Sequence, residues 1–513
     1  MAGGGAVVGR LRGRRPGGRG RLLHGHVLLH YVLSPASSSP SGRNAAGEPV
    51  STHFVIIGNG AAGYRAAKAL RRADSAAQVS ILTEERHPFY LRRQLGEFLA
   101  GNLTLGEVIF QSRNAYRRER LDLFLMTRVE QVDPPAHEVV LANGERVRYD
   151  RLLVATGTHA VPPDIPGTDL EGVATFDTLT QAQEVRRLVK DVRDAAILGE
   201  GIVGLTLAES LAALGVRVTQ LVRGERFWPE MLDEATSARV EDLLEGAGVT
   251  LLRQTEARTV IGAGGRAIGV ETAAGETLRA ELVAVGCRRR PAIDIVQGSG
   301  IQVRQGILVS DALRTSAADV FAAGDVAEPT ESEEFGPDDA AFCWQRAWAQ
   351  GGVAAAGMLD RRAEPALEAM RLRTALFGRD LAVIGRGHLP AGGSVAAVEM
   401  PDGPEVFRRL VFQDDALVGA VVFGTGESVH ELNRLVAERA GRRRVALALG
   451  LQEAQPAPGP MPTTQARHCP ICAAEIVIHY GTAAGAAIRC PACSTDLVVR
   501  WDGQNMWLDV SRP

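Results

Sequence analysis

Glycine turns at two places in the chain have the spacing that nucleotide phosphates require. The first spans residues 58–63 (GNGAAG), between an apolar run at 54–57 and an alanine-rich helical pattern. Its first glycine permits a sharp turn, its second lets the backbone approach a pyrophosphate, and its third allows close packing of helix on strand. Free N–H groups at the start of the following helix attract the same anion. The candidate binding residues are Gly58, Gly60, Ala61, Ala62 and Gly63.

A second turn of the same type spans residues 199–204 (GEGIVG). It follows an apolar run at 195–198, and the pattern predicts a helix after it and a strand over 216–222. Two such turns in one chain predict two bound nucleotides, and the alternative is a duplicated fold with one inactive site. The candidate residues are Gly199, Gly201, Ile202, Val203 and Gly204.

The residue that ends the strand after each turn bears on which nucleotide binds. Glu84, about twenty residues past the first turn, would accept hydrogen bonds from an adenosine ribose. The corresponding position after the second turn is Arg223, with Arg226 close behind. Arginine suits the 2′-phosphate of NADPH, whereas a carboxylate suits NADH. The pattern slightly favours NADPH, and ordinary solvated loop charges are the alternative.

Four of the six cysteines form two CPxC pairs near the end of the chain. They are Cys469, Cys472, Cys490 and Cys493, and seventeen residues separate the pairs. Each pair can aim two sulfurs at one tetrahedral ion, and expected strands at 476–478, 497–501 and 506–510 complete a zinc-ribbon-like pattern. A rubredoxin-type iron site is the alternative, and two unrelated thiol pairs are the interpretation we favour least.

Length and composition set the class of protein. A chain of 513 residues exceeds one ordinary core, and its 45% apolar and 23% charged residues are typical of soluble globular domains. A net charge of −3 gives no global field for nucleic acid or an anionic membrane. No apolar run reaches the roughly 18 residues of a membrane span. We expect a cytoplasmic protein, because CxxC pairs in such a chain indicate a metal site in a reducing compartment.

Two further motifs make the pattern specific. The strand 151–154 leads into Ala155, Thr156 and Gly157, and the segment 319–325 reads DVFAAGD. Together with the glycine turns, they resemble the two-dinucleotide-binding flavoprotein reductases, the pyridine nucleotide-linked, FAD-containing oxidoreductases. The resemblance implies that Asp325 hydrogen-bonds the ribityl chain of FAD. It adds Gly286, at the exit of an expected strand over 282–285, and Gly324 to the candidate site.

The segment after Glu84 is most similar to the rubredoxin/ferredoxin reductase and nitrite reductase flavin-subunit branch. This similarity rests on the pattern Tyr90-x-Arg92 and on the C-terminal domain, and it implies that Arg92 lies at the flavin. Two positions depart from the family's habit: Arg93 stands near its usual proline, and Thr206 stands where a glutamate is common.

Two segments follow Asp325. Residues 328–339 are rich in acids and are expected to form an exposed loop, with an acidic docking surface as the alternative. Residues 344–358 are expected to form a helix. The resemblance places Trp344 and Gln345 of this helix near the flavin, and core packing is the alternative.

We therefore expect an α/β fold with two Rossmann-like domains, which bind FAD and NAD(P), a small α+β C-terminal domain and a zinc-ribbon-like tail. The expected units are a disordered or targeting extension (1–50), an FAD-binding domain (51–158 and 286–360), an NAD(P)-binding domain (159–285), a C-terminal dimerisation or interface domain (365–445), a proline-rich linker (452–466) and a four-cysteine, zinc-ribbon-like domain (467–513).

The implied activity is transfer of electrons from NAD(P)H through FAD to an acceptor, ferredoxin or rubredoxin. No catalytic acid or base is expected, because the cofactors perform the chemistry. Residues 54–157 contain no cysteine, which excludes dithiol chemistry there. A homodimer is expected, and nucleic acid is not expected as a partner. The alternative function is an NAD(P)H-responsive flavoprotein sensor whose zinc ribbon binds protein or nucleic acid.

Overall fold

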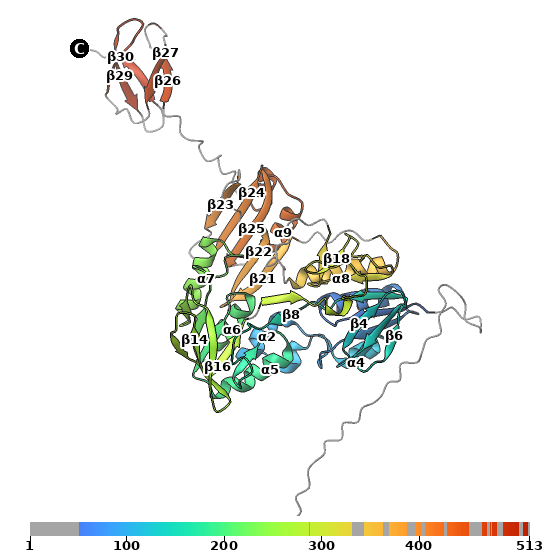
Figure 1. Cartoon of the computed structure of the whole chain (residues 1–513). Helices are drawn as coiled ribbons and strands as arrows, with labels where there is room; N and C mark the ends of the chain where they lie inside the picture. Colours follow the sequence, from blue (N-terminus) through green and yellow to red (C-terminus); the bar gives the residue numbers. More distant parts are fainter. Residues whose placement is uncertain are drawn as a thin grey trace, which may run out of the picture.

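The computed structural model describes most of the chain from Ser51 onward. The described residues are 51–286, 288–330, 343–362, 369–386, 395–401, 406–424, 428–450, 464–468, 472, 475–479, 486–501 and 506–510. The expectations for residues 1–50, for Cys469 and for the acid-rich stretch 331–339 lie outside them. No helix in the described part of the chain is long and apolar enough to cross a bilayer. Figure 1 shows how the elements are arranged.

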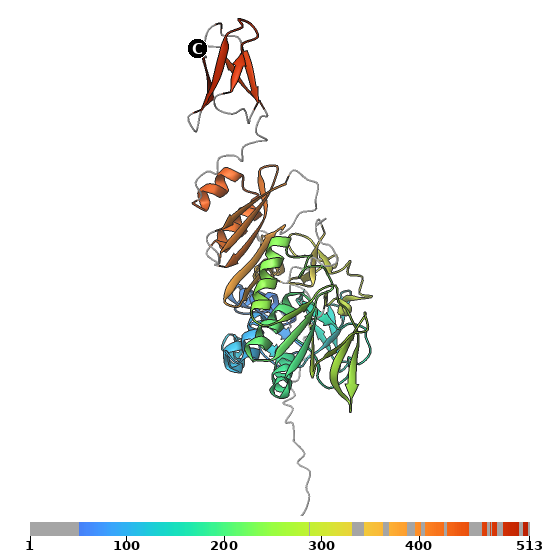
Figure 2. The same ribbon diagram turned by 90° about the vertical axis from the view of Figure 1, so that its left-hand side faces the viewer.

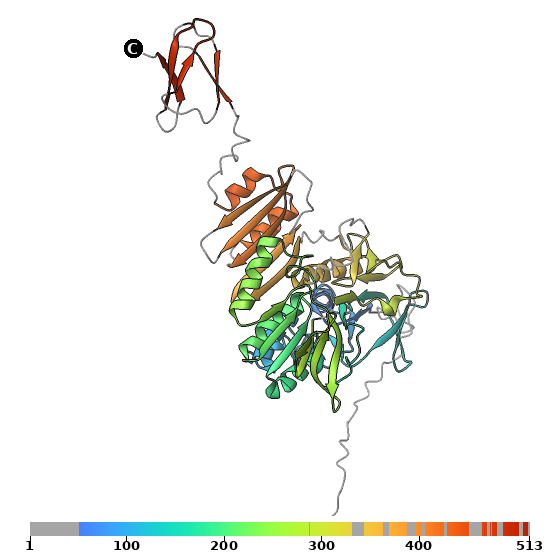
Figure 3. The ribbon, with the colours of Figure 1, turned by 60° about the vertical axis from the view of Figure 1, so that its left-hand side comes forward.

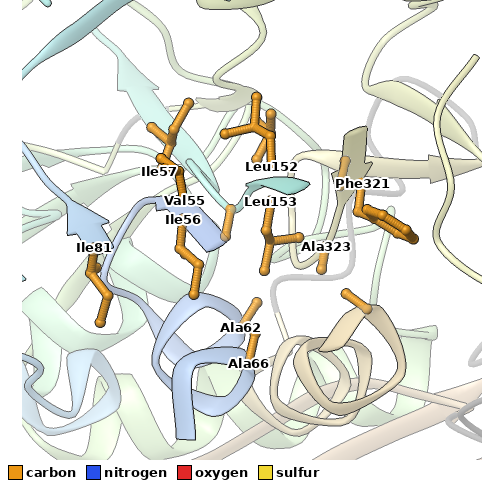
Figure 4. Close-up of a cluster of buried hydrophobic side chains, with 14 of the residues drawn as sticks. Val55, Ile56, Ile57, Ala62, Ala66, Ile81, Leu152, Leu153, Phe321 and Ala323 are labelled. Carbon is orange, nitrogen blue, oxygen red and sulfur yellow. The ribbon is translucent and has the colours of Figure 1, made fainter. Parts of the chain in front are cut away.

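The first unit contains a five-stranded parallel sheet in the order β19-β7-β1-β2-β3. Its strands are β1 (His53–Ile57), β2 (Gln78–Leu82), β3 (Asp122–Phe124), β7 (Arg151–Val154) and β19 (Val320–Ala322). Helix α1 (Ala61–Ala73) connects β1 to β2. Figure 4 shows Ile56 and Leu153 pointing towards Ala62 and Ala66 of α1, so the sheet and the helix share one core.

Helix α8 (Trp344–Met358) packs beside α1 and matches the helix expected there. The two backbones lie very close, because a Cβ on Gly351 would be 2.3 Å from the carbonyl oxygen of Ala62. Gln350 of α8 accepts a hydrogen bond from the backbone N–H of Gly324, at 2.7 Å. The helix thereby fixes the turn that follows β19.

The second unit repeats the plan of the first. Its parallel sheet has the order β12-β11-β10-β16-β9. The strands are β9 (Val173–Thr175), β10 (Asp194–Leu198), β11 (Arg217–Leu221), β12 (Thr250–Leu252) and β16 (Leu282–Val285), with helices α5 (Leu179–Leu188), α6 (Ile202–Ala213) and α7 (Glu234–Gly246). Each unit also carries a three-stranded antiparallel sheet, β4-β5-β6 in the first and β13-β14-β15 in the second.

A third, antiparallel sheet has the order β21-β22-β25-β24-β23. Its strands are β21 (Met370–Leu376), β22 (Arg379–Gly385), β23 (Val395–Pro401), β24 (Phe407–Gln413) and β25 (Ala416–Gly424). One face packs on the core of the second unit through Leu372, Leu381 and Phe423. Helices α9 (Val429–Ala437) and α10 (Arg442–Ala448) pack with the side chains of the other face, such as Ile384.

The last part of the chain forms two small sheets. One pairs β26 (Thr464–His468) with β27 (Glu475–His479), and the other is β28-β29-β30 (Ala487–Arg489, Asp496–Trp501 and Met506–Val510). Figures 1, 2 and 3 all show these strands apart from the other sheets. The expectation of linker up to residue 466 needs correction, because β26 begins at Thr464 and pairs along its length with β27.

The remaining elements are short. They are η1 (Arg92–Gln94), α2 (Leu95–Ala100), α3 (Leu105–Val108), α4 (Arg113–Arg118), β4 (Val129–Asp133), β5 (Glu138–Leu141), β6 (Arg146–Arg148), β8 (Thr158–Val161), η2 (Val189–Asp191), β13 (Ala257–Ala263), β14 (Arg266–Thr272), β15 (Thr277–Arg279), β17 (Arg288–Pro291), η3 (Asp294–Val296), β18 (Ile307–Val309) and β20 (Ala327–Pro329). Strands β8 and β17 pair antiparallel.

Glu328 corrects one expectation. The sequence predicts an exposed acidic loop that includes this residue, but Glu328 lies in β20, and only 4% of it is exposed. Its carboxylate accepts hydrogen bonds from Arg304 and from the backbone N–H of Gly306. Glu328 is thus a buried carboxylate paired with an exposed arginine, and composition does not show which acid has such a partner.

Candidate functional site

The glycine that ends each central strand cannot be replaced by a larger residue. Gly58 and Gly199 have φ angles of +103° and +127°, a region that side chains disfavour. A Cβ on Gly58 would lie 2.2 Å from the carbonyl oxygen of Ala155, and one on Gly199 would lie 2.2 Å from that of Gly286. The two turns are therefore built alike, each against the exit of the neighbouring strand.

The other glycines divide into two kinds. A Cβ on Gly63 would meet the carbonyl oxygen of Gly58 at 2.0 Å, so this position packs helix on strand. Gly60 and Gly201 instead have no atom within 4 Å of an added Cβ. Each begins a helix whose N-terminus has no side-chain cap and no acid in its first turn. These two open positions with free N–H groups fit a pyrophosphate.

Both turns open on one pocket. The lining includes Gly60 of the first turn, Ile202 at the start of α6, and Leu372 of the third sheet. Ten of the candidate residues line it: Gly60, Ala61, Ala62, Arg92, Ala155, Gly157, Ile202, Val203, Gly324 and Asp325. The pocket thus lies where the first two units and a strand of the third sheet, β21, come together.

Ten other candidates do not line this pocket: Gly58, Gly63, Glu84, Thr156, Gly199, Gly201, Gly204, Arg223, Arg226 and Gly286. Gly58 and Gly199 lie against the exits of neighbouring strands, and Gly63 and Gly204 pack a helix against the turn before it. The Thr156 hydroxyl donates to the carbonyl of Ala292, at 2.9 Å. Glu84 is exposed beyond the end of β2, and Arg223 and Arg226 lie in the loop after β11.

A network of charges crosses the pocket from one unit to the other. Arg92 donates to Asp177 at 2.9 Å and to Glu85 at 3.0 Å, and Arg289 of β17 also pairs with Asp177. Burial alone would raise the pKa of Asp177, but the two guanidinium groups hold it below its usual range. The carboxylate therefore stays charged and links the element that carries Arg92 to the loop before α5.

Asp325 stands in the same pocket. Burial raises the pKa of its carboxyl, and the positive charge of Arg289 opposes this rise. A carboxyl in such surroundings needs a polar partner, because burying it without a hydrogen bond is costly. A ligand hydroxyl would meet that requirement.

Asn59 and Tyr116 are site residues that the sequence did not indicate. The Tyr116 hydroxyl donates to Oδ1 of Asn59 at 3.0 Å, and the backbone N–H of Phe89 donates to that hydroxyl at 3.4 Å. Nδ2 of Asn59 is buried without a partner among the described residues, although Asn59 lines the pocket. Tyr116 thus fixes the amide so that its N–H₂ group is available to a ligand oxygen.

Aromatic rings form one wall of the site. Trp344 and Phe89 line the pocket, and Trp344 stacks on Trp348 with ring centroids 5.0 Å apart. Trp348 in turn stacks on Phe89, at 6.4 Å. Arg93, the residue at the expected proline position, lies over the Trp344 ring at 5.9 Å. Trp344 and Gln345 both line the pocket.

A separate cluster of thiols lies in the tail. The sulfurs of Cys472, Cys490 and Cys493 lie within 4.8 Å of one another, and the first two are 3.6 Å apart. Hydrogen bonds from Thr495 lower the pKa of Cys493 to about 6. Four sulfurs around a zinc ion at roughly 2.3 Å would be separated by about 3.8 Å, and the described trio is close enough together that it could hold a metal ion.

A shared pocket between two parallel-sheet units, each with a glycine turn of the type that fits a pyrophosphate, is typical of a protein that brings two dinucleotides together. The chain belongs to the pyridine nucleotide-disulphide oxidoreductase family, whose model matches residues 52–351. That family uses FAD and a pyridine nucleotide. The open glycines, the unpartnered Asn59 amide and Asp325 fit these two groups.

Similar proteins agree with this class. The chain is 30% identical over 387 residues to the ferredoxin–NAD(+) reductase component of a biphenyl dioxygenase system in Paraburkholderia xenovorans, covering 75% of this chain and 93% of that protein. It is 27% identical to the assimilatory nitrate reductase electron transfer subunit of Bacillus subtilis, covering 75% of this chain but only 49% of the longer relative. A ferredoxin reductase structure from Rhodopseudomonas palustris shares the fold, with a TM-score of 0.70 at 24% identity, covering 76% of this chain and 95% of the other.

Proposed function

We propose that the chain is an FAD-dependent NAD(P)H oxidoreductase that passes electrons to a redox protein, ferredoxin or rubredoxin. The observation that carries this proposal is the single pocket reached by both glycine turns, from Gly60 on one side and Ile202 on the other. Two dinucleotides held by these turns would have their reactive ends in the same space.

The chemistry supplied by bound FAD is acceptance of a hydride from NAD(P)H and release of the electrons to an acceptor. The chain's residues bind and orient the two cofactors. Asp325 accepts a hydrogen bond from the ribityl chain, and the N–H groups after Gly60 and Gly201 hold the pyrophosphates. The stacked Trp344, Trp348 and Phe89 side chains exclude water from one side of the pocket.

The choice of acceptor rests on relatives and on chemistry together. Relatives of this chain are named ferredoxin reductases and rubredoxin reductases. Cys343 is the one cysteine among the described residues that line the pocket, so this described lining offers no pair of thiols for disulfide reduction. Cys343 itself is buried, and its thiol lies 3.2 Å from the Gln345 side-chain oxygen.

The test is rapid mixing of the flavin-loaded chain with NADH or NADPH in the absence of oxygen. Loss of the oxidised flavin absorbance, followed by its return on mixing with ferredoxin or rubredoxin, is the expected result. Protein that stays colourless after incubation with FAD would refute the proposal. If NAD(P)H reduces the flavin but neither carrier reoxidises it, only the proposed acceptors are ruled out.

Arg223 supports a small preference for NADPH. Its side chain is 52% exposed at the end of β11, where the adenosine ribose lies in this fold, and Arg226 follows. The measurement is the ratio of kcat/KM for NADPH to that for NADH. Replacing Arg223 with glutamate is expected to lower this ratio, because the new charge repels the 2′-phosphate.

The tail is proposed to hold one zinc ion on Cys469, Cys472, Cys490 and Cys493. The three described sulfurs support this set, and a tetrahedral zinc site needs one more ligand. Elemental analysis of the purified full chain is expected to give one zinc per chain. If the analysis finds iron and the protein shows a visible thiolate charge-transfer band, the site is of the rubredoxin type and the zinc assignment is wrong.

A further inference from the structure

The second glycine turn contains an acid at a position where the pyrophosphate needs none. Glu200 lies between Gly199 and Gly201, and only 5% of it is exposed. It is not among the residues that line the central pocket, so its carboxylate has no place in the chemistry described above. It lies instead where the adenosine half of a nicotinamide cofactor binds in this fold.

The Glu200 carboxylate points at the end of β11. Oε2 accepts a hydrogen bond from the backbone N–H of Arg223 at 3.2 Å, and Oε1 lies 3.5 Å from Nε of the same residue. β11 lies beside β10 in parallel, which brings the glycine turn and the strand end to the same edge of the sheet. In this fold that edge holds the adenosine ribose and its 2′ substituent.

The ribose edge therefore presents two opposite charges. Arg223 alone would attract a 2′-phosphate, but Glu200 already neutralises part of its charge. Burial raises the pKa of Glu200, and the N–H and guanidinium groups of Arg223 oppose this rise. Moving the Arg223 guanidinium onto a phosphate would leave the buried carboxylate with only the backbone N–H and beside a second anion, and both changes are unfavourable.

We propose that Glu200 determines how well this site distinguishes NADPH from NADH: its carboxylate opposes the 2′-phosphate and restrains Arg223, so that both nicotinamides are used. This inference rests on the proposed function. It adds a residue within the glycine turn to the strand-end arginine as a determinant of specificity.

The test compares the flavin-loaded full-length chain with its Glu200→Gln variant in steady-state turnover with each nicotinamide and a dye as electron acceptor. The amide keeps the size of the side chain and removes the charge. The ratio of kcat/KM for NADPH to that for NADH is expected to rise about tenfold, mainly through a lower KM for NADPH. Glu225→Gln is the matched control, because Glu225 is an exposed acid two residues after Arg223. The control is expected to leave the ratio unchanged.

An unchanged or lower ratio in Glu200→Gln would overturn the inference, and so would an equal rise in the control. If neither nicotinamide reduces the flavin of the unaltered chain, the proposed function itself fails. Calorimetric titration of the unaltered chain with 2′,5′-ADP and with 5′-AMP gives a second test that needs neither a variant nor turnover. Kd values within about fivefold of each other are expected, and a larger preference for 2′,5′-ADP would also overturn the inference.

Discussion

At the scale of single residues, Tyr116 controls whether the Asn59 amide is ready for a ligand. Replacing Tyr116 with phenylalanine removes the hydroxyl that donates to Asn59 at 3.0 Å. A free amide can rotate, so we expect the Kd for FAD to rise about fivefold, equivalent to about 1 kcal/mol for one hydrogen bond. Fluorescence titration of the apoprotein with FAD measures this change.

Tyr149 provides the matched control for this prediction. Its hydroxyl is also buried, but it has no hydrogen-bond partner among the described residues. Tyr149→Phe is therefore expected to leave the Kd for FAD unchanged. A Tyr116→Phe variant that binds FAD as tightly as the unaltered chain would show that Asn59 does not need this support.

The site residues divide into those that a local sequence motif predicts and those that only the fold brings together. The glycine turns and Asp325 carry local signals, and the structure brings Gly60 and Asp325 to one pocket. The contacts of Asn59 with Tyr116, and of Asp177 with Arg92 and Arg289, join residues 57, 85 and 112 positions apart. Nothing in one sequence pairs such distant side chains, because their meeting depends on how the sheets are placed.

At the scale of elements, the two kinds of glycine in a turn are expected to respond differently to alanine. At Gly60 the added methyl group meets nothing, so Gly60→Ala should fold normally but bind FAD more weakly, because the methyl occupies the space of the pyrophosphate. At Gly63 the methyl would lie 2.0 Å from the Gly58 carbonyl oxygen, so Gly63→Ala should separate α1 from β1. We expect the latter to lose about 3 kcal/mol of stability or more.

Thermal unfolding of both apoproteins, together with FAD titration, distinguishes these outcomes. Equal loss of stability in the two variants would mean that Gly60 is also a packing position. Gly201→Ala and Gly204→Ala repeat the comparison in the second unit. A Cβ on Gly201 meets nothing, whereas one on Gly204 lies 2.4 Å from the Gly199 carbonyl oxygen. Gly201→Ala is expected to weaken binding of the nicotinamide cofactor and not of FAD.

Asp177 links elements of the two units, so its charge is expected to stabilise the chain in a pH-dependent way. Its pKa is lowered on folding, so the stabilisation is present above the unfolded pKa of about 4 and is lost as the pH falls through the lower folded value. Asp177→Asn is expected to cost about 3 kcal/mol at pH 7, because it leaves Arg92 and Arg289 without their shared anion.

Denaturant unfolding at pH 7 and at about pH 3.5 measures this difference between the variant and the unaltered chain. The difference should begin to shrink at about pH 3.5, by about 1 kcal/mol or less, because the aspartate of the unfolded chain is then largely protonated while Asp177 in the folded chain stays charged. Asp164→Asn, a change at an exposed aspartate, is the control and is expected to have no effect at either pH. A cost for Asp177→Asn that does not change with pH would show that the side chain acts by shape and not by charge.

At the scale of the whole molecule, the tail lies apart from the three larger sheets in every view (Figures 1, 2 and 3). Its small core contains the buried Cys490 together with Leu497 and Val499, so the metal is expected to stabilise the tail and nothing else. Cys490→Ser should release the metal, while flavin reduction by NAD(P)H stays within about twofold of that of the unaltered chain. Elemental analysis and anaerobic rapid mixing measure the two effects on the same sample. Slower flavin reduction would show that the tail reaches the central pocket, whereas slower transfer to the carrier alone would make the tail part of the electron path.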